Sequence, residues 1–236
     1  MMANGETADQ SLSGLLDQAL PHARPERLGH LILRGDPQFF RLAAEESEEV
    51  VRTALGLGVR YAEELVAEQG SRDPLALAAR LGIKVVISDD RSRYGHVLQY
   101  AEYHSRPPQI QVYRKAMESI NRLLEDPAIA ELLGLSDVTP AFLAHELFHH
   151  LDNLPDRQPA KRVRQVVTMS LGPWRIRSGL IAAPEVAAGS FAQTLLPMPF
   201  HLKLFDLLAI FGESPIRAAE WARALARADD ESRLTA

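Results

Sequence analysis

The chain has 236 residues, of which 46% are hydrophobic and 24% are charged, and it contains no cysteine. This composition indicates one globular domain, or one domain with an appendage, and excludes a disordered or collagen-like chain. Without cysteine there is no disulfide and no thiolate metal site, so any metal must be bound by His, Asp or Glu. Because the net charge is −5, we do not expect nucleic acid as the main partner.

The first ten residues, MMANGETADQ, have neither the positive charges nor the apolar run of a secretory signal. No stretch of the chain approaches the roughly 18–20 apolar residues that a membrane helix needs. We therefore expect a cytoplasmic protein that has no membrane partner.

Three regions differ in their sequence pattern. Residues 1–28 mix polar residues with Gly and Pro, and they predict a flexible N-terminal tail with one short helix. Residues 29–75 predict a helical N-terminal segment, because apolar residues recur at steps of three and four. We expect Gly56 and Gly58 to interrupt this helical pattern. Residues 76–236 then form the main domain.

A short helix is expected over 75–81, at the start of the main domain, and after it the spacing of the apolar residues changes from a helical to a strand pattern. Segments 83–88, 96–103 and 109–113 are short, rich in β-branched or aromatic residues, and separated by turn residues. They predict a small three-stranded antiparallel sheet. Residues 114–135 return to a helical pattern, which an Asp-Pro pair breaks. The expected fold class is therefore α+β and mainly helical, with this sheet packed on the helix that comes next.

That next helix contains His145-Glu146-Leu147-Phe148-His149, an H-E-x-x-H sequence. Residues four apart lie on one face of a helix, so both imidazoles can bind a single Zn²⁺, and the pattern is a metalloprotease signature. Glu146 lies beside them, where it can act as a general base on a metal-bound water. The other side chains of this helix are mostly apolar, which predicts a buried helix whose polar residues face a common site.

A catalytic zinc ion needs a third protein ligand and one open position. Glu185 is the best candidate on spacing, because small residues three, four and seven positions later share its helix face. Such residues allow this helix to approach the first one closely. The alternative is that Glu185 is a first-turn glutamate that the helix dipole stabilises.

Several other polar residues have open roles. His150 is either a packing residue or a support for a metal ligand, and Asp152 either orients a ligand histidine or ends the helix. Residues 156–177 are rich in Arg and Lys, and they form either a solvated loop or helix face, or a basic rim beside the site that recruits an acidic segment or nucleic acid. Candidate donors for an oxyanion are Tyr103, His104, His150, Arg175 and His201.

These residues resemble the ImmA/IrrE family of zinc metallopeptidases. Residues 144–150 read AHELFHH, as in the family's A-H-E-x-x-H helix, which two or three short strands precede. Glu185 then begins a second helix, which continues through Gly189 and Phe-Ala at 191–192 and closes with LLPMP at 195–199. Two departures are Ala187, where many members have a second glutamate, and the extra proline in the closing motif.

The resemblance implies a gluzincin-like endopeptidase in which His145, His149 and Glu185 bind Zn²⁺ and Glu146 is the catalytic base. Its substrate would be a specific intracellular protein or peptide, such as a transcriptional repressor, whose backbone a strand at 109–113 binds by strand addition. The alternative is a regulatory, protein-binding module of the same fold that contains zinc and has little turnover.

Overall fold

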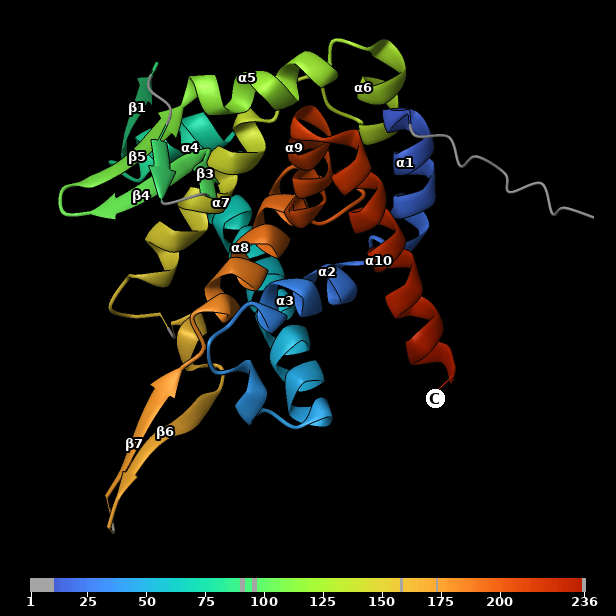
Figure 1. Ribbon diagram of the computed structural model, residues 1–236. Helices are drawn as coiled ribbons and strands as arrows, with labels where there is room; N and C mark the ends of the chain where they lie inside the picture. Colours follow the sequence, from blue (N-terminus) through green and yellow to red (C-terminus); the bar gives the residue numbers. More distant parts are fainter. Residues whose placement is uncertain (1–10, 90–91, 95–96, 158, 173, 235–236) are drawn as a thin grey trace, which may run out of the picture.

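Helices dominate the computed structural model, which describes residues 11–89, 92–94, 97–157, 159–172 and 174–234 (Figure 1). The α-helices are α1 (Leu12–Ala19), α2 (Pro25–Arg34), α3 (Ala44–Gln69), α4 (Pro74–Arg80), α5 (Arg114–Leu123), α6 (Pro127–Leu133), α7 (Thr139–Asp152), α8 (Ala182–Leu195), α9 (Phe205–Glu213) and α10 (Pro215–Leu234). Four short 3-10 helices are η1 (Leu20–His22), η2 (Phe39–Arg41), η3 (Ala160–Arg162) and η4 (Leu202–Leu204). None of the described helices combines the length and the apolar character that a membrane span requires.

The strands are β1 (Lys84–Ser88), β2 (Ser92–Tyr94), β3 (Val97–Gln99), β4 (Ala101–Ser105), β5 (Pro108–Tyr113), β6 (Gln165–Leu171) and β7 (Trp174–Gly179). They form a three-stranded sheet in the order β1-β5-β4 and two separate pairs, β2-β3 and β6-β7. The fold is therefore α+β and mainly helical, as expected.

The three-stranded sheet is mixed, so the predicted antiparallel arrangement is wrong. β1 runs parallel to β5, with Lys84 opposite Gln109, whereas β4 runs antiparallel to β5, with Tyr103 opposite Ile110. The difference arises because the segment predicted as one strand at 96–103 is two strands. β3 pairs with β2, and the chain then turns into β4; His96 itself lies outside the described residues. Helix α7 packs against β4 and β5, so the sheet does cover the helix with the H-E-x-x-H sequence.

Helix α3 runs unbroken through Gly56 and Gly58, contrary to our expectation of an interruption. Gly58 instead allows α3 and α8 to touch. A Cβ at Gly58 would lie 2.2 Å from the carbonyl oxygen of Ala187, which is far closer than any side chain permits. At the same contact the hydroxyl of Ser190 donates a hydrogen bond of 2.9 Å to the carbonyl oxygen of Leu55.

The N-terminal residues that the structure describes, 11–28, contain the short helix that we predicted, which is α1, but they contribute buried side chains to the core where we expected a flexible tail; residues 1–10 lie outside the described part. Ser11 caps α1 by accepting a hydrogen bond from the backbone N–H of Gly14. The buried stripe of α1 packs against α10, and it consists of Leu12, Leu15, Leu16 and Ala19. Apolar residues at these steps make one helix face, which the C-terminal helix covers.

The helices of the 29–75 segment share this core with the rest of the chain, because α2 and α3 both pack against α8. The short predicted helix at 75–81 is confirmed as α4, which Asp73 caps and Gly82 follows with a φ of +69°. The predicted break between α5 and α6 is also confirmed, since the carboxylate of Asp126 caps α6.

Residues 165–179 form a β-hairpin that projects from the body of the molecule, at the lower left of Figure 1. We call this hairpin the arm. The alternative of a loop or helix face for 156–177 is therefore wrong for residues 165–171 and 174–177, which are strands. Its residues alternate in polarity near the turn, and Gly172 has a φ of +57°, a conformation that glycine adopts without strain.

Candidate metal centre

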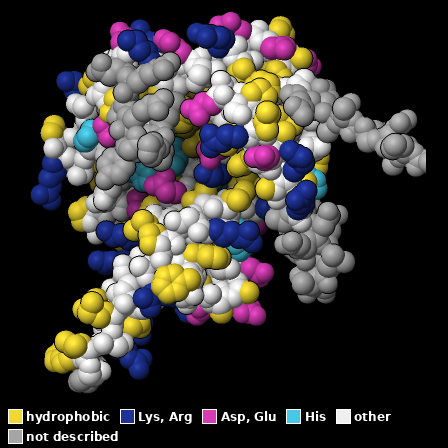
Figure 2. All heavy atoms as spheres, viewed as in Figure 1, with side chains coloured by type: hydrophobic (Ala, Val, Ile, Leu, Met, Phe, Trp, Pro, Cys, Tyr) yellow, Lys and Arg dark blue, Asp and Glu magenta, His cyan; other side chains and the backbone are white. Residues whose placement is uncertain are grey.

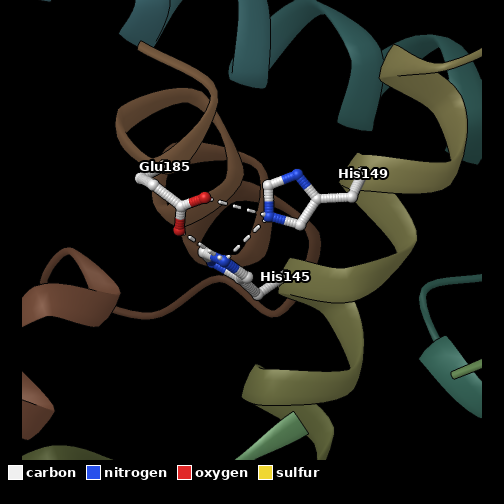
Figure 3. Close-up of side chains that lie close together, drawn as sticks. All are labelled: His145, His149 and Glu185. Atoms are coloured by element: carbon white, nitrogen blue, oxygen red, sulfur yellow. Dashed lines mark hydrogen bonds and ion pairs between the residues drawn. The ribbon is translucent and has the colours of Figure 1, made fainter. Parts of the chain in front are cut away.

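Two neighbouring helices bring three potential metal ligands together. His145 and His149 lie one turn apart on α7, and Glu185 lies in the first turn of α8 (Figure 3). The Nε2 atoms of the two histidines are 3.1 Å apart. The carboxylate oxygens of Glu185 lie 3.2 Å from Nε2 of His145 and 3.5 Å from Nε2 of His149. The three residues that we predicted as ligands therefore meet in space.

The spacing of these atoms fits a bound metal ion. Four ligand atoms at tetrahedral positions around zinc are about 3.3 Å from one another. The two Nε2 atoms are 3.1 Å apart, Oε2 of Glu185 lies 3.2 Å from His145, and Oε1 of Glu185 lies 3.5 Å from His149, so each of these pairs is close to this value. One ligand atom from each of the three residues lies within 4.8 Å of the others. A group of two imidazoles and one carboxylate accepts several divalent metals, so the geometry indicates a metal site and not the identity of the metal.

Helix α7 is held in place at its start and along its buried faces. The carboxylate of Asp137 accepts hydrogen bonds from the backbone N–H and the hydroxyl of Thr139, which begins the helix. Leu147 and Phe148, between the two ligand histidines, are fully buried. Because these side chains fix the rotation of α7, both imidazoles are turned toward α8.

Helix α8 approaches α7 and α3 closely because its buried side chains are small. The buried residues with small side chains are Ala182, Ala183, Ala187, Ala188, Gly189, Ser190 and Ala192. The carboxylate of Asp36, in the loop after α2, accepts a hydrogen bond of 2.9 Å from the backbone N–H of Ala182 and so fixes the start of the helix. Glu185 follows one turn later, with its side chain half exposed.

The charges in the ligand cluster depend on one another. Burial and the neighbouring His145 lower the pKa of His149 to about 4. Burial acts in the same way on His145, but the hydrogen bond and charge of Glu185 outweigh it and raise its pKa. Desolvation raises the pKa of Glu185, yet its hydrogen bond to His145 and the charge of His145 are the main causes that lower it to about 2. Glu185 is therefore ionised and His149 neutral at pH 7, as metal ligands must be, whereas the raised pKa of His145 favours a proton that a bound metal would displace.

Glu146 is a buried carboxylate outside the ligand cluster. Its side chain is 7% exposed, and burial raises its pKa to about 7. The backbone N–H of Tyr103 in β4 donates a hydrogen bond to its carboxylate and lowers that pKa in part. A carboxyl group with a pKa near 7 can both take up and release a proton at neutral pH.

A cavity of about 450 Å³ opens beside the centre. His145, Glu146 and Glu185 line one side of it. Figure 2 shows histidine and acidic side chains gathered in a hollow on this face of the molecule. The opposite walls carry aromatic and aliphatic groups together with one ion pair, formed by Lys203 and Asp206 at 2.5 Å. The cavity is large enough for several side chains of a peptide.

The five residues considered as oxyanion donors have different positions. His201 lines the cavity, but its Nε2 faces the carbonyl oxygen of Val186 at 3.2 Å, and its Nδ1 accepts from the N–H of Lys203. The single N–H of a neutral imidazole is thus already used. His104 pairs with a glutamate at the surface, and Arg175 lies on the arm.

Tyr103 and His150 form a pair of their own, with 2.9 Å between the phenol oxygen and Nδ1 of the imidazole. His150 is buried, and burial lowers its pKa. Asp152 accepts a hydrogen bond of 2.6 Å from the backbone N–H of Ala160, so it fixes the chain after α7 and does not orient a ligand histidine. Among the described residues, nothing hydrogen-bonds to the buried Nδ1 of His145.

Two features of the site were missed from the sequence. Strand addition was expected at 109–113, which is β5, but β5 lies between β1 and β4, so β4 is the edge strand beside α7. Lys203 also lines the cavity, and its charge helps to lower the pKa of Glu185. Neither position follows a local pattern, because both depend on strand order and on how η4 folds back over α8.

No protein-family model matches this chain, and neither a curated protein nor a solved structure is significantly similar to it.

Proposed function

We propose that this chain is a zinc-dependent endopeptidase, as its resemblance to the ImmA/IrrE family implies, and that it hydrolyses a peptide bond in a specific protein. One observation carries the proposal. Two imidazole nitrogens lie 3.1 Å apart and each is within 3.5 Å of a carboxylate oxygen of Glu185, and a buried carboxylate outside this group lies next to them on the wall of an open cavity. A purely structural metal site needs neither the extra carboxylate nor the open side.

In this proposal His145, His149 and Glu185 hold the zinc ion, which would supply Lewis acidity toward a peptide carbonyl and a water nucleophile at neutral pH. Glu146 takes the proton of the attacking water and passes it to the leaving amine. The group must change protonation state twice in each turnover, and its burial beside the ligands places the carboxylate within reach of both proton transfers. The N–H of Tyr103 holds the carboxylate in position for this transfer.

The outer edge of β4 provides a place for the substrate backbone. Among the described strands β4 pairs with β5 alone, and on the side of α7 the N–H of Tyr103 donates to Glu146. An extended peptide beside this edge would run past the metal centre, and its side chains would enter the cavity lined by Phe142 and Phe205. By the same resemblance the substrate is a regulatory protein, such as a transcriptional repressor.

Ala187, where many members of the family have a second glutamate, is the departure that favours the weak-turnover alternative. Its side chain is fully buried at the contact with α3, where its carbonyl oxygen approaches Gly58. It does not line the cavity. The missing carboxylate therefore removes no charged group from the reaction space, which supports a working enzyme.

Metal binding is the first test. We expect purified protein to hold about one equivalent of zinc by elemental analysis, and His145→Ala to lose it, because two remaining ligands bind zinc far more weakly. His104→Ala is the matched control, since this histidine lies at the surface away from the cavity. A wild-type chain that takes up no divalent metal even when supplied would end the proposal.

Turnover is the second test. Glu146→Gln keeps the volume of the side chain but cannot accept a proton at neutral pH, so it should retain zinc and lose roughly 10²–10⁴-fold in cleavage rate. New N-termini generated in a cell lysate, measured by mass spectrometry, report cleavage of any protein in the mixture, so the substrate need not be identified first. Glu118→Gln, an exposed glutamate on α5, is the control.

Comparing Glu185→Gln with Glu146→Gln distinguishes the proposed metal ligand from the proposed base. It removes a charged ligand, so zinc content and melting temperature should fall together, whereas Glu146→Gln changes neither. Equal cleavage by Glu146→Gln and wild type would contradict the mechanism. If wild type holds zinc and cleaves nothing, the protein is the zinc-containing binding module of the alternative.

A further inference from the structure

The arm carries four large apolar side chains on one face. Met169 is opposite Ile176 and Leu171 is opposite Trp174 in the register of the hairpin. Side chains of cross-strand partners share a face, and residues two apart along a strand do so as well, so these four side chains form one patch. Their exposed fractions are 58%, 55%, 72% and 74% in the same order. We call this patch the apolar face of the arm; Figure 2 shows hydrophobic side chains along the projecting hairpin.

Arginines occupy the opposite face of the arm. Arg175 and Arg177 alternate with the apolar residues of β7, and both side chains are exposed. Within the described residues, neither arginine forms an ion pair with a carboxylate. Residues 157–184 contain six of the 26 Lys and Arg of the chain and none of its 31 Asp and Glu. The arm is therefore a basic element of an acidic protein.

The base of the arm is fixed to the body of the molecule. The guanidinium of Arg41 donates hydrogen bonds to the carbonyl oxygens of Val167 (3.0 Å) and Thr168 (3.4 Å) in β6. Arg164, next to the first strand, pairs with Glu46 of α3. These contacts tie the arm to η2 and α3, so its direction is set by the fold.

The arm also links the two helices of the metal centre. The chain leaves α7 after the ligand histidines, passes through η3 and the arm, and enters α8 at Ala182, one turn before Glu185. Asp36 fixes that entry by its hydrogen bond to Ala182. The arm is therefore continuous in the chain with both helices that carry the predicted metal ligands.

A two-stranded hairpin buries too little to be stable by itself, and contiguous exposed apolar side chains of this size mark interaction sites. We propose that the arm is a docking surface for the protein substrate, and that it binds a segment that presents apolar side chains flanked by Asp or Glu. This inference rests on the proposed function. The arginines supply charge complementarity, while the apolar face favours a protein over nucleic acid, since phosphates offer nothing apolar to cover it.

Fluorescence anisotropy with the full chain tests this inference. The probes are three labelled twelve-residue peptides, which alternate Leu with Glu, Leu with Lys, and Ser with Glu. Wild type should bind the Leu–Glu peptide most tightly, and Leu171→Ser with Trp174→Ser should weaken that binding at least tenfold, since aromatic anchors dominate docking. Arg175→Glu with Arg177→Glu should weaken it about as much and remove most of its salt dependence.

Matched variants show whether the effect belongs to the arm. Leu75→Ser with Ile216→Ser changes two apolar residues that are 57% and 65% exposed elsewhere on the surface, and it should leave binding unchanged. Arg164 is left intact, because reversing it would break its pair with Glu46 at the base of the arm. Zinc content and circular dichroism of each variant show that the fold and the metal centre are preserved.

Several outcomes would overturn the docking proposal: equal binding of the Leu–Glu peptide to wild type and the arm variants, or no binding by wild type. So would arm-dependent dimerisation in sedimentation equilibrium, or tighter arm-dependent binding to phosphatidylserine vesicles or to a 20-base-pair DNA duplex. Cleavage separates this inference from the proposed function. Arm-dependent binding without any cleavage supports the docking surface and contradicts the peptidase, whereas arm-independent cleavage does the reverse.

Discussion

β7 and α8 follow one another in the chain, separated only by Leu180 and Ile181, but their apolar residues differ in size and in burial. The side chains of α8 are mostly small and buried, whereas Trp174 and Ile176 of β7 are large and exposed. In α8 small residues allow two other helices to come close. In the arm large residues lie opposite one another across the hairpin and stay more than half exposed. Residue type by itself therefore does not indicate burial; the size of the side chain and the available neighbours decide it.

Glu185 combines features of the packed and the exposed regions. It is in the first turn of α8, so the packed contact with α7 positions it, yet its side chain is half exposed toward the cavity. The ligand thus has a rigid backbone and an accessible carboxylate. Substitutions in the packed helix α8 and in the exposed arm can be made separately, and their effects on stability can be compared.

Filling the contact between α3 and α8 should have a large effect on stability. In Gly58→Ala the new Cβ would lie 2.2 Å from the carbonyl oxygen of Ala187 and 2.8 Å from the nitrogen of Phe191, so two helix backbones must move apart. We expect a loss of about 3 kcal/mol in the free energy of unfolding, the upper range for overpacking. Urea unfolding measures it, and zinc affinity should fall as well, because α8 carries Glu185.

Gly56→Ala is the control for this substitution. Gly56 lies on the same helix, just before Gly58, and a Cβ there would meet nothing within 4 Å. Replacing an unneeded glycine inside a helix should therefore stabilise the protein by about 0.5–1 kcal/mol. Opposite signs for the two variants support the close contact, whereas similar losses for both would contradict it.

The two glycines also show what the sequence can and cannot predict. Both glycines are expected to break the helix because glycine has a low helix propensity, and a short stretch of sequence shows only such local preferences. The reason for Gly58 lies in a helix about 130 residues away, and no local pattern contains it. The same limit explains the parallel pairing of β1 with β5, which depends on where the chain goes between them.

Local rules succeed where the cause is local. Asp73 and Asp126 cap α4 and α6, each followed by proline, and both helices are found as predicted. The ligand histidines follow from the period of one helix. Glu185 is different, because its meeting with them was predicted from small residues three, four and seven positions later. These three residues are buried and Gly189 packs against His201, but the close contact with α3 is made by Ala187, Ser190 and Phe191. For the arm, the sequence showed the charges but not the hairpin.

The buried side chain of His201 makes the stability of the protein depend on pH. Burial, together with the nearby charges of His145 and Lys203, lowers the pKa of His201 to about 4, while its hydrogen bond to Val186 opposes this decrease. In the unfolded chain this pKa is about 6.5. The unfolded state therefore binds more protons between pH 6.5 and 4, and stability is lost as the pH falls through this range.

The expected size of this loss between pH 7.5 and pH 5 is about 2 kcal/mol from His201. His201→Gln removes the titrating group and keeps an N–H for Val186. Urea unfolding of the metal-free protein should therefore show a smaller decrease for the variant than for wild type over this interval. Comparing the two removes the contributions of the other titrating groups, which both proteins share. Parallel decreases would show that His201 is not responsible.

Substitutions in the arm should have the smallest effect on stability. Trp174 is 74% exposed and Leu171 is 72% exposed, so serine at either position leaves no cavity and exposes no new core. We expect a change within about 0.5 kcal/mol in the free energy of unfolding.

Leu195→Ser in α8 is the matched substitution, because this leucine is fully buried, and it should cost about 2–5 kcal/mol. A large loss from Leu171→Ser in the isolated protein would mean that the apolar face already contributes to the fold. A small loss, together with weakened binding of the Leu–Glu peptide, would mean that these side chains serve binding to another protein and not folding.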